Sequence, residues 1–397
     1  MQKNWWINIY EPGIQFPDSA SVAPAYSGRQ VALFRVLFAT QQLHNLTSIF
    51  NYTQPFTVES GETLPGFHLA YTTHGKLNAA KDNVVWIFHA LTANSNPVEW
   101  WPGLVGENKF FDPSKYFIIC VNKPGSPYGS ISPLSNNPLT NLTYYHQFPV
   151  FTIRDMIKSF QCLKDYLGIK KIFIGLGGST GGMQLLEWAI EEPELFEHIV
   201  PIATNAILSP WAIAFNASQR MAIEADSSWL EQRHDAGQKG LSAARSIALL
   251  SYRHYNGYDI TQRRDKSFVP LSDNTVYAAD NYQRYQGLKL TSRFNVVCYY
   301  RLTQSMDSHD VGRNRNGTDA ALKTIKARTL VIGISSDVLY PVPEQEYLQK
   351  TIPGGQLLII NSDYGHDGFL LEFEIIEAAL KSFIKDNKSY QLKIVNE

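Results

Sequence analysis

The stretch "GLGGSTGGMQLLEWA" at residues 175–189 places one serine among glycines, between an apolar run and a run with helical spacing. The spacing Gly177-x-Ser179-x-Gly181 is that of a nucleophile elbow, a tight turn from strand to helix that exposes a serine hydroxyl. Strand and helix approach closely at such a turn, so the positions two before and two after the serine must lack side chains. We therefore predict that Ser179 is a nucleophile at the carboxyl edge of a sheet.

A glycine-rich turn without chemistry and a phosphate-binding loop are the alternatives for this stretch. No lysine follows the glycines as it does in a P-loop, and the GxGxxG spacing of dinucleotide sites is absent. A serine hydroxyl alone is inert near neutral pH, so the nucleophile hypothesis requires a histidine base and an acid farther along the chain.

An acid and a histidine both follow Ser179 in the sequence, in the order serine, acid, histidine that a catalytic triad on this kind of turn uses. "VIGISSDVLYP" places Asp337 just after a strand-like run, and "LLIINSDYGHDGFLLE" places His366 in the loop after the next one. The carboxyl ends of parallel strands meet at one edge of a sheet, which would bring Asp337 and His366 towards Ser179. Asp363 and Asp367 compete for the role of the acid, but they share a loop with the base, whereas Asp337 arrives from another strand.

Composition narrows the classes of protein. The 397 residues are 44% hydrophobic and 18% charged, enough for a large buried core, and the net charge of −1 disfavours nucleic acid or a membrane surface as a partner. Cys120, Cys162 and Cys298 have no CxxC spacing, which argues against disulfides and a structural metal site. No signal peptide or membrane span is evident, so we expect a cytoplasmic protein.

The order of strand-like and helix-like runs along the chain predicts an α/β fold with a mostly parallel sheet, helices on both faces and an inserted helical lid. Residues 1–52 lack a periodic pattern and are expected to form a poorly ordered extension. Strand-like and helix-like runs alternate over 53–205, which we interpret as the first part of the core. Amphipathic helical runs occupy residues 206–322, which we predict to form the lid. Strand-like runs occur again over 323–397, the second part of the core.

Eight pieces of the sequence, in order, resemble the homoserine O-acetyltransferases, acyltransferases of the α/β-hydrolase fold that act in methionine biosynthesis. The resemblance extends from about Tyr52 to Phe383. The pieces are "HALTANSN" at 89–96, "GS.YGS.SP.S..P" within 125–138, "FP.FTIRDM" at 148–156, "GGSTGGMQLLEWA" at 177–189, "GLSAAR" at 240–245, "YQGLK" at 285–289, "SSDVLYP" at 335–341 and "DYGHDGFL" at 363–370.

The resemblance implies roles for residues that the pattern alone leaves open. It implies Ser179 as nucleophile, Asp337 as orienting acid and His366 as base, in agreement with the reading from the residues. It also implies that the backbone amides of Leu91 and Thr180 form the oxyanion hole.

For the acceptor, the resemblance implies that Arg245 holds the carboxylate of homoserine and Asp367 its ammonium group. A cation and an anion match the two charges of an α-amino acid, and arginine offers a two-pronged fit to a carboxylate. Arg220 is a rival cation. His309 and Asp310 form a second polar pair, but they lack a neighbouring elbow serine and are interpreted as a polar helix end.

The sequence departs from the usual pattern of this family at five positions. Pro124 and Pro127 replace a leucine and a cysteine, and Ser132 replaces a glycine. Asn295 and Val297 replace an aspartate and an asparagine. The resemblance is therefore weaker around these two segments than at the triad.

Together these observations predict an enzyme that moves an acetyl group from acetyl-CoA to L-homoserine through an acyl-serine. The implied co-substrate is acetyl-CoA, with no permanently bound cofactor and no metal, and the family resemblance implies a homodimer formed through the lid helices. Succinyl-CoA as donor, L-serine as acceptor, and a serine esterase of the same fold are the alternatives within enzymes. A binding protein without activity is disfavoured by the intact triad.

Overall fold

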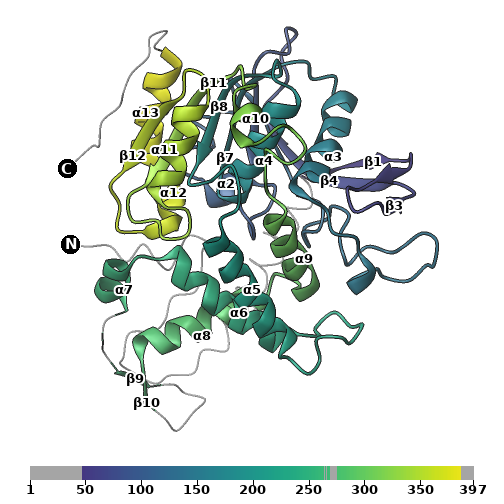
Figure 1. Cartoon of the computed structure of the whole chain (residues 1–397), viewed down its shortest axis with the longest axis vertical. Helices are drawn as coiled ribbons and strands as arrows, with labels where there is room; N and C mark the ends of the chain where they lie inside the picture. The colour runs from purple at the N-terminus through teal and green to yellow at the C-terminus, as the bar shows by residue number, and fades with distance from the viewer. Residues whose placement is uncertain (1–46, 263, 265, 269–274, 386–397) are drawn as a thin grey trace, which may run out of the picture.

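The computed structural model describes residues 47–262, 264, 266–268 and 275–385 (Figure 1). Of the extension predicted at 1–52, residues 1–46 lie outside the described residues. The large sheet consists of β1 (Thr47–Tyr52), β4 (Phe67–His74), β5 (Val84–Phe88), β6 (Phe117–Val121), β7 (Ile172–Gly178), β8 (Phe196–Ile202), β11 (Arg328–Ile334) and β12 (Gln356–Ile360). Two small hairpins pair β2 (Phe56–Thr57) with β3 (Thr63–Leu64) and β9 (Lys266–Phe268) with β10 (Thr275–Tyr277).

The described helices fall into those outside and those inside the segment of chain between β8 and β11. The first group consists of α2 (Pro97–Trp100), η2 (Tyr145–Gln147), α3 (Ile153–Tyr166), α4 (Thr180–Glu191), α11 (Val342–Thr351), η3 (Gly365–Asp367), α12 (Gly368–Leu371) and α13 (Phe373–Lys385). The second consists of α5 (Pro210–Glu224), α6 (Gln238–Tyr252), α7 (Tyr255–Thr261), α8 (Ala278–Thr291), α9 (Val296–Asp307) and α10 (Thr318–Leu322).

The sheet has the order β1-β4-β6-β5-β7-β8-β11-β12. The six strands in the order β6-β5-β7-β8-β11-β12 are parallel to one another, while β4 pairs antiparallel with both β6 and β1 at one edge. Parallel neighbours require crossovers that cover the sheet, and helices supply them here. The predicted α/β fold with a mostly parallel sheet is confirmed.

The sheet begins earlier than the sequence pattern predicts. β1 starts at Thr47 and pairs along its whole length of 6 residues with β4, so these residues belong to the core sheet, and the predicted boundary at residue 52 is wrong for them. Phe50 is its one buried residue and packs edge-on against Phe67, with ring centroids 6.3 Å apart. A single buried residue gives no alternating pattern, which is why the strand escaped prediction.

Two apolar cores lie on opposite faces of the sheet, as alternate residues of β5 demonstrate. Trp86 points to the face covered by α3 and α4, where its ring meets Trp188 at 4.8 Å between centroids. Val85 and Ile87 point to the other face, which α13 covers. Helices therefore cover both faces (Figure 1), and in such folds ligands bind at the carboxyl edge of the parallel strands.

Helices α5 to α9 lie beyond that carboxyl edge, whereas α10 packs beside the sheet against α4 and α11 (Figure 1). α6 packs against α5 and α8 and also contacts η3, the turn that carries His366. This segment thus forms a layer over the edge of the sheet, in the region where the sequence predicts a lid. In the described part of the chain, no helix has the length and apolar character that a membrane crossing requires.

Candidate active site

Ser179 stands at the junction between β7, which ends at Gly178, and α4, which begins at Thr180. Its backbone has φ 58° and ψ −125°, a conformation that costs a residue with a side chain of order 1–3 kcal/mol. Its amide donates to the Ile202 carbonyl of β8 at 3.0 Å, which ties the turn to the next strand. The strain aims the serine side chain over the sheet edge, the geometry of a nucleophile elbow.

The glycines around Ser179 are required by close backbone contacts. A Cβ on Gly177 would lie 2.5 Å from the carbonyl carbon of Gly181, and a Cβ on Gly181 would lie 2.2 Å from the Phe88 carbonyl oxygen. Both separations are far below van der Waals contact, and backbone atoms cannot yield as a flexible side chain can. The steric reason predicted for the GxSxG spacing therefore holds here.

His366 and Asp337 meet although they come from different loops. The Nδ1–H group of His366 donates to Oδ2 of Asp337 at 2.7 Å, and both side chains are buried. The other carboxylate oxygen of Asp337 accepts the amides of Leu339 and Tyr340 at 2.8 and 3.0 Å. With the proton on Nδ1, the Nε2 atom of His366 is left as an acceptor, the form that a general base needs.

The two rival acids do not orient His366. Asp363 is 62% exposed and lies near His254 and Asn256. Asp367 forms an ion pair with Arg253. Only Asp337 of the three aspartates is bonded to the histidine.

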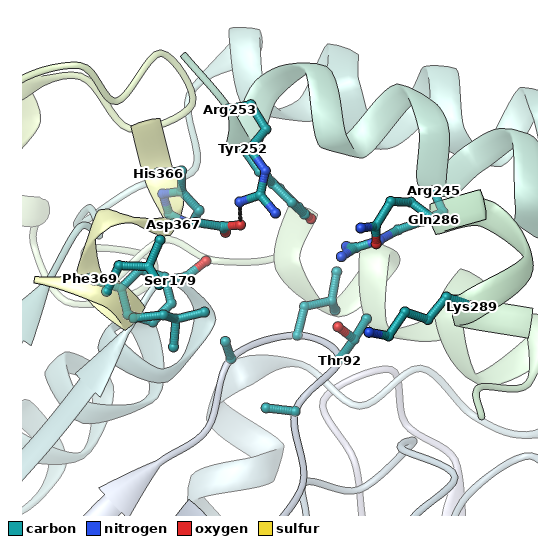
Figure 2. A pocket seen from close by; sticks show the side chains of 15 residues that line it. Thr92, Ser179, Arg245, Tyr252, Arg253, Gln286, Lys289, His366, Asp367 and Phe369 are labelled. Carbon is teal, nitrogen blue, oxygen red and sulfur yellow. Dashed lines mark ion pairs between the residues drawn. The ribbon is translucent and has the colours of Figure 1, made fainter. Parts of the chain in front are cut away.

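The predicted residues converge on one pocket of about 850 Å³, its open mouth included. Ser179 and His366 form one end, and Arg245 lies across the pocket from them with Gln286 and Lys289 (Figure 2). The lining consists of Ala90, Leu91, Thr92, Ala93, Ser179, Arg245, Tyr252, Arg253, Gln286, Lys289, His366, Asp367, Phe369, Leu370 and Leu371. Asp337 lies behind His366, and Thr180 is buried beside Ser179.

The charged side chains of the pocket form two groups. Asp367 points to Arg253, its ion-pair partner, near the His366 end (Figure 2). Arg245 lies over the Tyr252 ring, 5.5 Å from its centroid, and Lys289 approaches from α8. The pocket thus combines one carboxylate with three cationic side chains, and an anionic ligand would be favoured in it.

The two amides predicted for the oxyanion hole are available. Within the described residues, neither the Leu91 amide nor the Thr180 amide donates a hydrogen bond. The loop that carries Leu91 is anchored by Arg293, which donates to the Thr92 carbonyl at 2.6 Å and to the Tyr128 hydroxyl. A second anchor is Lys123, fully buried behind Thr180.

Several charged or polar residues of the site were not predicted. Arg253, Gln286 and Lys289 line the pocket, and Lys123 lies beneath it. Gln286 and Lys289 are inside the motif "YQGLK", so the motif marked the segment without assigning the side chains. Lys123 follows the buried run "YFIICVN", and a lysine at the carboxyl end of a buried strand was the available signal.

Other candidates from the sequence lie elsewhere. Arg220 pairs with Asp307 at 2.6 Å and does not line the pocket. His309 is buried and bonded to the Asn205 carbonyl, a structural contact. The described residues include no cluster of three or more metal-binding side chains.

The five departures from the family pattern are also outside the pocket lining. Asn295 caps α9 by accepting the Val297 amide at 2.9 Å, and Val297 is in the core. Pro124 is buried and Pro127 half-buried in the loop after β6, and Ser132 is buried.

Known proteins resemble this chain both in sequence and in structure. The α/β-hydrolase fold family matches residues 83–373. The homoserine O-acetyltransferase of Cyclobacterium marinum is 48% identical over 344 residues, 85% of this chain and 95% of that protein, and that of Chlorobaculum parvum is 42% identical over 83% and 92%. The crystal structure of the homoserine O-acetyltransferase from Staphylococcus aureus, 27% identical, superposes with a TM-score of 0.71 over 87% of this chain and 96% of that one.

Proposed function

The chain belongs to the homoserine O-acetyltransferase family of the α/β-hydrolase fold, and we propose that it transfers acetyl groups in two steps through an acetyl ester on Ser179. The observation that carries this proposal is the 2.7 Å hydrogen bond between His366 and Asp337 at a pocket that Ser179 also lines. A buried acid, an oriented imidazole and an elbow serine are the three parts of an acyl-transfer site.

In the first step, Nε2 of His366 takes the proton of the Ser179 hydroxyl as the serine oxygen attacks the thioester carbon of acetyl-CoA. The carbonyl oxygen becomes an oxyanion that the Leu91 and Thr180 amides stabilise. The carbon–sulfur bond then breaks, the imidazolium returns its proton to the sulfur, and CoA leaves an acetyl-enzyme.

In the second step, the hydroxyl of L-homoserine gives its proton to His366 and attacks the acetyl ester. Collapse of the second tetrahedral intermediate returns the proton to Ser179 and releases O-acetylhomoserine. Water would compete for the same ester, so the layer of helices over the sheet edge acts as the lid that limits hydrolysis. The chemistry uses acetyl-CoA as co-substrate and needs no resident cofactor.

The acceptor is held by its two charges. Arg245, on the wall opposite the triad, binds the carboxylate, and Asp367, beside His366, binds the ammonium group. Because Asp367 is paired with Arg253, the ammonium group of the substrate shares this carboxylate with the guanidinium.

The assembly is a homodimer formed through the lid. Large apolar side chains are exposed on this segment, with Met221 66%, Leu230 77%, Leu250 59% and Leu288 65% exposed. A second copy of the same surface would bury them. We place the enzyme in the cytoplasm, where its free cysteines would remain reduced.

The test of the proposed function measures free thiol release from acetyl-CoA with L-homoserine, L-serine or no acceptor. The proposal predicts rapid thiol release with homoserine and slow release with serine or water. Equal release in all three reactions would indicate an esterase, and release from succinyl-CoA in preference to acetyl-CoA would contradict the donor.

A further inference from the structure

Lys123 is a buried cation next to the reaction site that the proposed mechanism does not use. It lies two residues past the end of β6 at the carboxyl edge of the sheet, and its side chain is among the largest fully buried ones of the described residues. Burying an ammonium group is costly, so its surroundings indicate what it does.

This ammonium group is bonded to both segments of the chain that carry the oxyanion-hole amides. Nζ of Lys123 donates to the Thr180 hydroxyl at 2.9 Å and to the His89 carbonyl at 2.8 Å. Thr180 supplies one oxyanion amide, and His89 begins the loop that supplies the other from Leu91. The lysine therefore links the start of α4 to the loop after β5, the two elements whose separation sets the width of the hole.

The backbone of Lys123 also sets the orientation of the Leu91 amide. The Lys123 amide donates to Nε2 of His89 at 3.1 Å, which leaves the imidazole proton on Nδ1. Nδ1 is 2.8 Å from the Ala90 carbonyl, so it donates to it. That carbonyl and the Leu91 N–H belong to the same planar peptide, so fixing one fixes the other.

No anion balances the charge of Lys123. The two groups that accept hydrogen bonds from its ammonium group, the His89 carbonyl and the Thr180 hydroxyl, are neutral. Within the described residues, no carboxylate lies within ion-pair distance of this ammonium group. The titratable groups that face it are His89 and Cys120. Burial, assisted by the charge of Lys123, holds the pKa of His89 well below its usual value, and burial raises the pKa of the Cys120 thiol, so both are neutral near pH 7.

We infer that Lys123 is a positioning residue whose ammonium charge, acting through Thr180 and the His89 carbonyl, stabilises the oxyanion formed at Ser179. The tetrahedral oxyanion is the anion that the resting site lacks, so the attraction arises only as the intermediate forms. An interaction that strengthens between ground state and transition state accelerates the reaction. This inference rests on the proposed acetyl-Ser179 pathway.

The inference predicts a pH dependence. Burial lowers the pKa of Lys123 to about 7. The lysine is therefore charged below neutral pH and loses its charge as the pH rises above about 7. Its contribution to acylation should be largest in mildly acidic solution and should fade in alkaline solution.

The experiment measures the single-turnover rate of CoA release for the native enzyme and for Lys123→Met from about pH 6 to about pH 9. The ratio of the two rates cancels the titration of groups common to both proteins. At the acidic end we expect the native rate to exceed that of the variant by about 10- to 100-fold, less than the loss on removing a direct oxyanion donor. The ratio of native to variant rate should then fall steadily towards the alkaline end. A ratio that is constant across the range, whether large or close to one, would overturn the inference.

Lys164→Met is the matched control. Lys164 is a buried lysine on α3, away from the pocket, and it forms an ion pair with Glu192 at 2.6 Å. Its ratio to the native rate should stay near one at every pH. If Lys123→Met does not fold, Lys123→Gln retains a donor without the charge and must give the same pH-dependent ratio. Failure of the native enzyme to form any acetyl-enzyme would instead refute the proposed function.

Discussion

His366 Nδ1 lies 2.7 Å from the carboxylate of Asp337, although the two residues follow different strands, β12 and β11. The two strands are neighbours and parallel, so their carboxyl ends bring the loops together. The two amides that bind the second oxygen of Asp337 hold the carboxylate ready to orient the imidazole. This relationship sets the tautomer on which the proposed chemistry depends.

Asp337→Asn should lower kcat by about 10³- to 10⁴-fold, because an amide in place of the acceptor carboxylate favours the wrong imidazole tautomer. The fold should be retained, since the substitution preserves size and shape. The control is Asp363→Asn, which alters an exposed carboxylate in the loop of His366 and should leave kcat within a factor of about two. Equal losses for the two variants would mean that the acid has been misassigned.

Arg245→Ala should impair transfer to homoserine without slowing the formation of acetyl-enzyme. The first step takes place before the acceptor binds, whereas the second loses a charge-assisted contact to the substrate carboxylate. The expected loss is about 30- to 1000-fold in kcat/KM for homoserine.

Arg220→Ala provides the comparison for this prediction, because Arg220 is paired with Asp307 outside the pocket. Pre-steady-state CoA release and steady-state transfer, measured on both variants, separate the two steps. Intact transfer in Arg245→Ala, or an equal loss in both steps, would place the acceptor site elsewhere.

β1 should contribute to stability. A chain that begins at Thr53 loses the backbone pairing with β4 and the burial of Phe50, while a chain that begins at Thr47 keeps both. We expect the shorter chain to be less stable by about 3 kcal/mol or more, the typical cost of removing a buried phenylalanine. Thermal unfolding of the two chains side by side measures the difference, and identical melting temperatures would show that β1 is dispensable.

The free energy of unfolding should decrease at low pH because of Glu59. Burial would raise its pKa, but hydrogen bonds from Arg313 and Thr152 and the charges of Arg313 and Arg154 outweigh it and lower the pKa to about 2. A lowered carboxyl pKa adds stability that is present above the unfolded value of 4.5 and is lost as the pH falls towards 2.

Glu59→Gln should therefore be less stable than the native chain by about 1 to 2 kcal/mol near pH 7, and this difference should shrink towards about pH 2 to 3. Urea unfolding across that range measures it. Glu62→Gln, an exposed neighbour, should show no such trend. A difference that stays constant with pH would refute the role of the carboxylate charge.

That the proposed nucleophile, base and acid lie close together was predictable, because each has a strong local signal in the sequence. Ser179 is flanked by glycines that backbone contacts require, and Asp337 and His366 each follow an apolar run that forms a parallel strand. Parallel strands bring their carboxyl ends to one edge whatever their separation in sequence, so position along the chain was enough to bring the three loops together.

The partners of charged side chains were not predictable in the same way. The ion pair of Asp367 with Arg253 joins η3 to the residue that follows α6, and no periodicity in either segment indicates that they meet. The partners of Lys123 were equally hidden, because His89 belongs to the loop after β5 and Thr180 to the start of α4. Such contacts follow from tertiary packing and not from local pattern.

The central claim, that acetyl transfer passes through Ser179, is tested most directly by trapping the intermediate. The enzyme is mixed with acetyl-CoA without acceptor, quenched in acid and digested, and its peptides are analysed by mass spectrometry. We predict one acetyl group on the peptide that contains Ser179, removed when homoserine is added before the quench and absent from Ser179→Ala. Acetyl-enzyme formation in Ser179→Ala, or an acetyl group on another residue that homoserine removes, would contradict the mechanism.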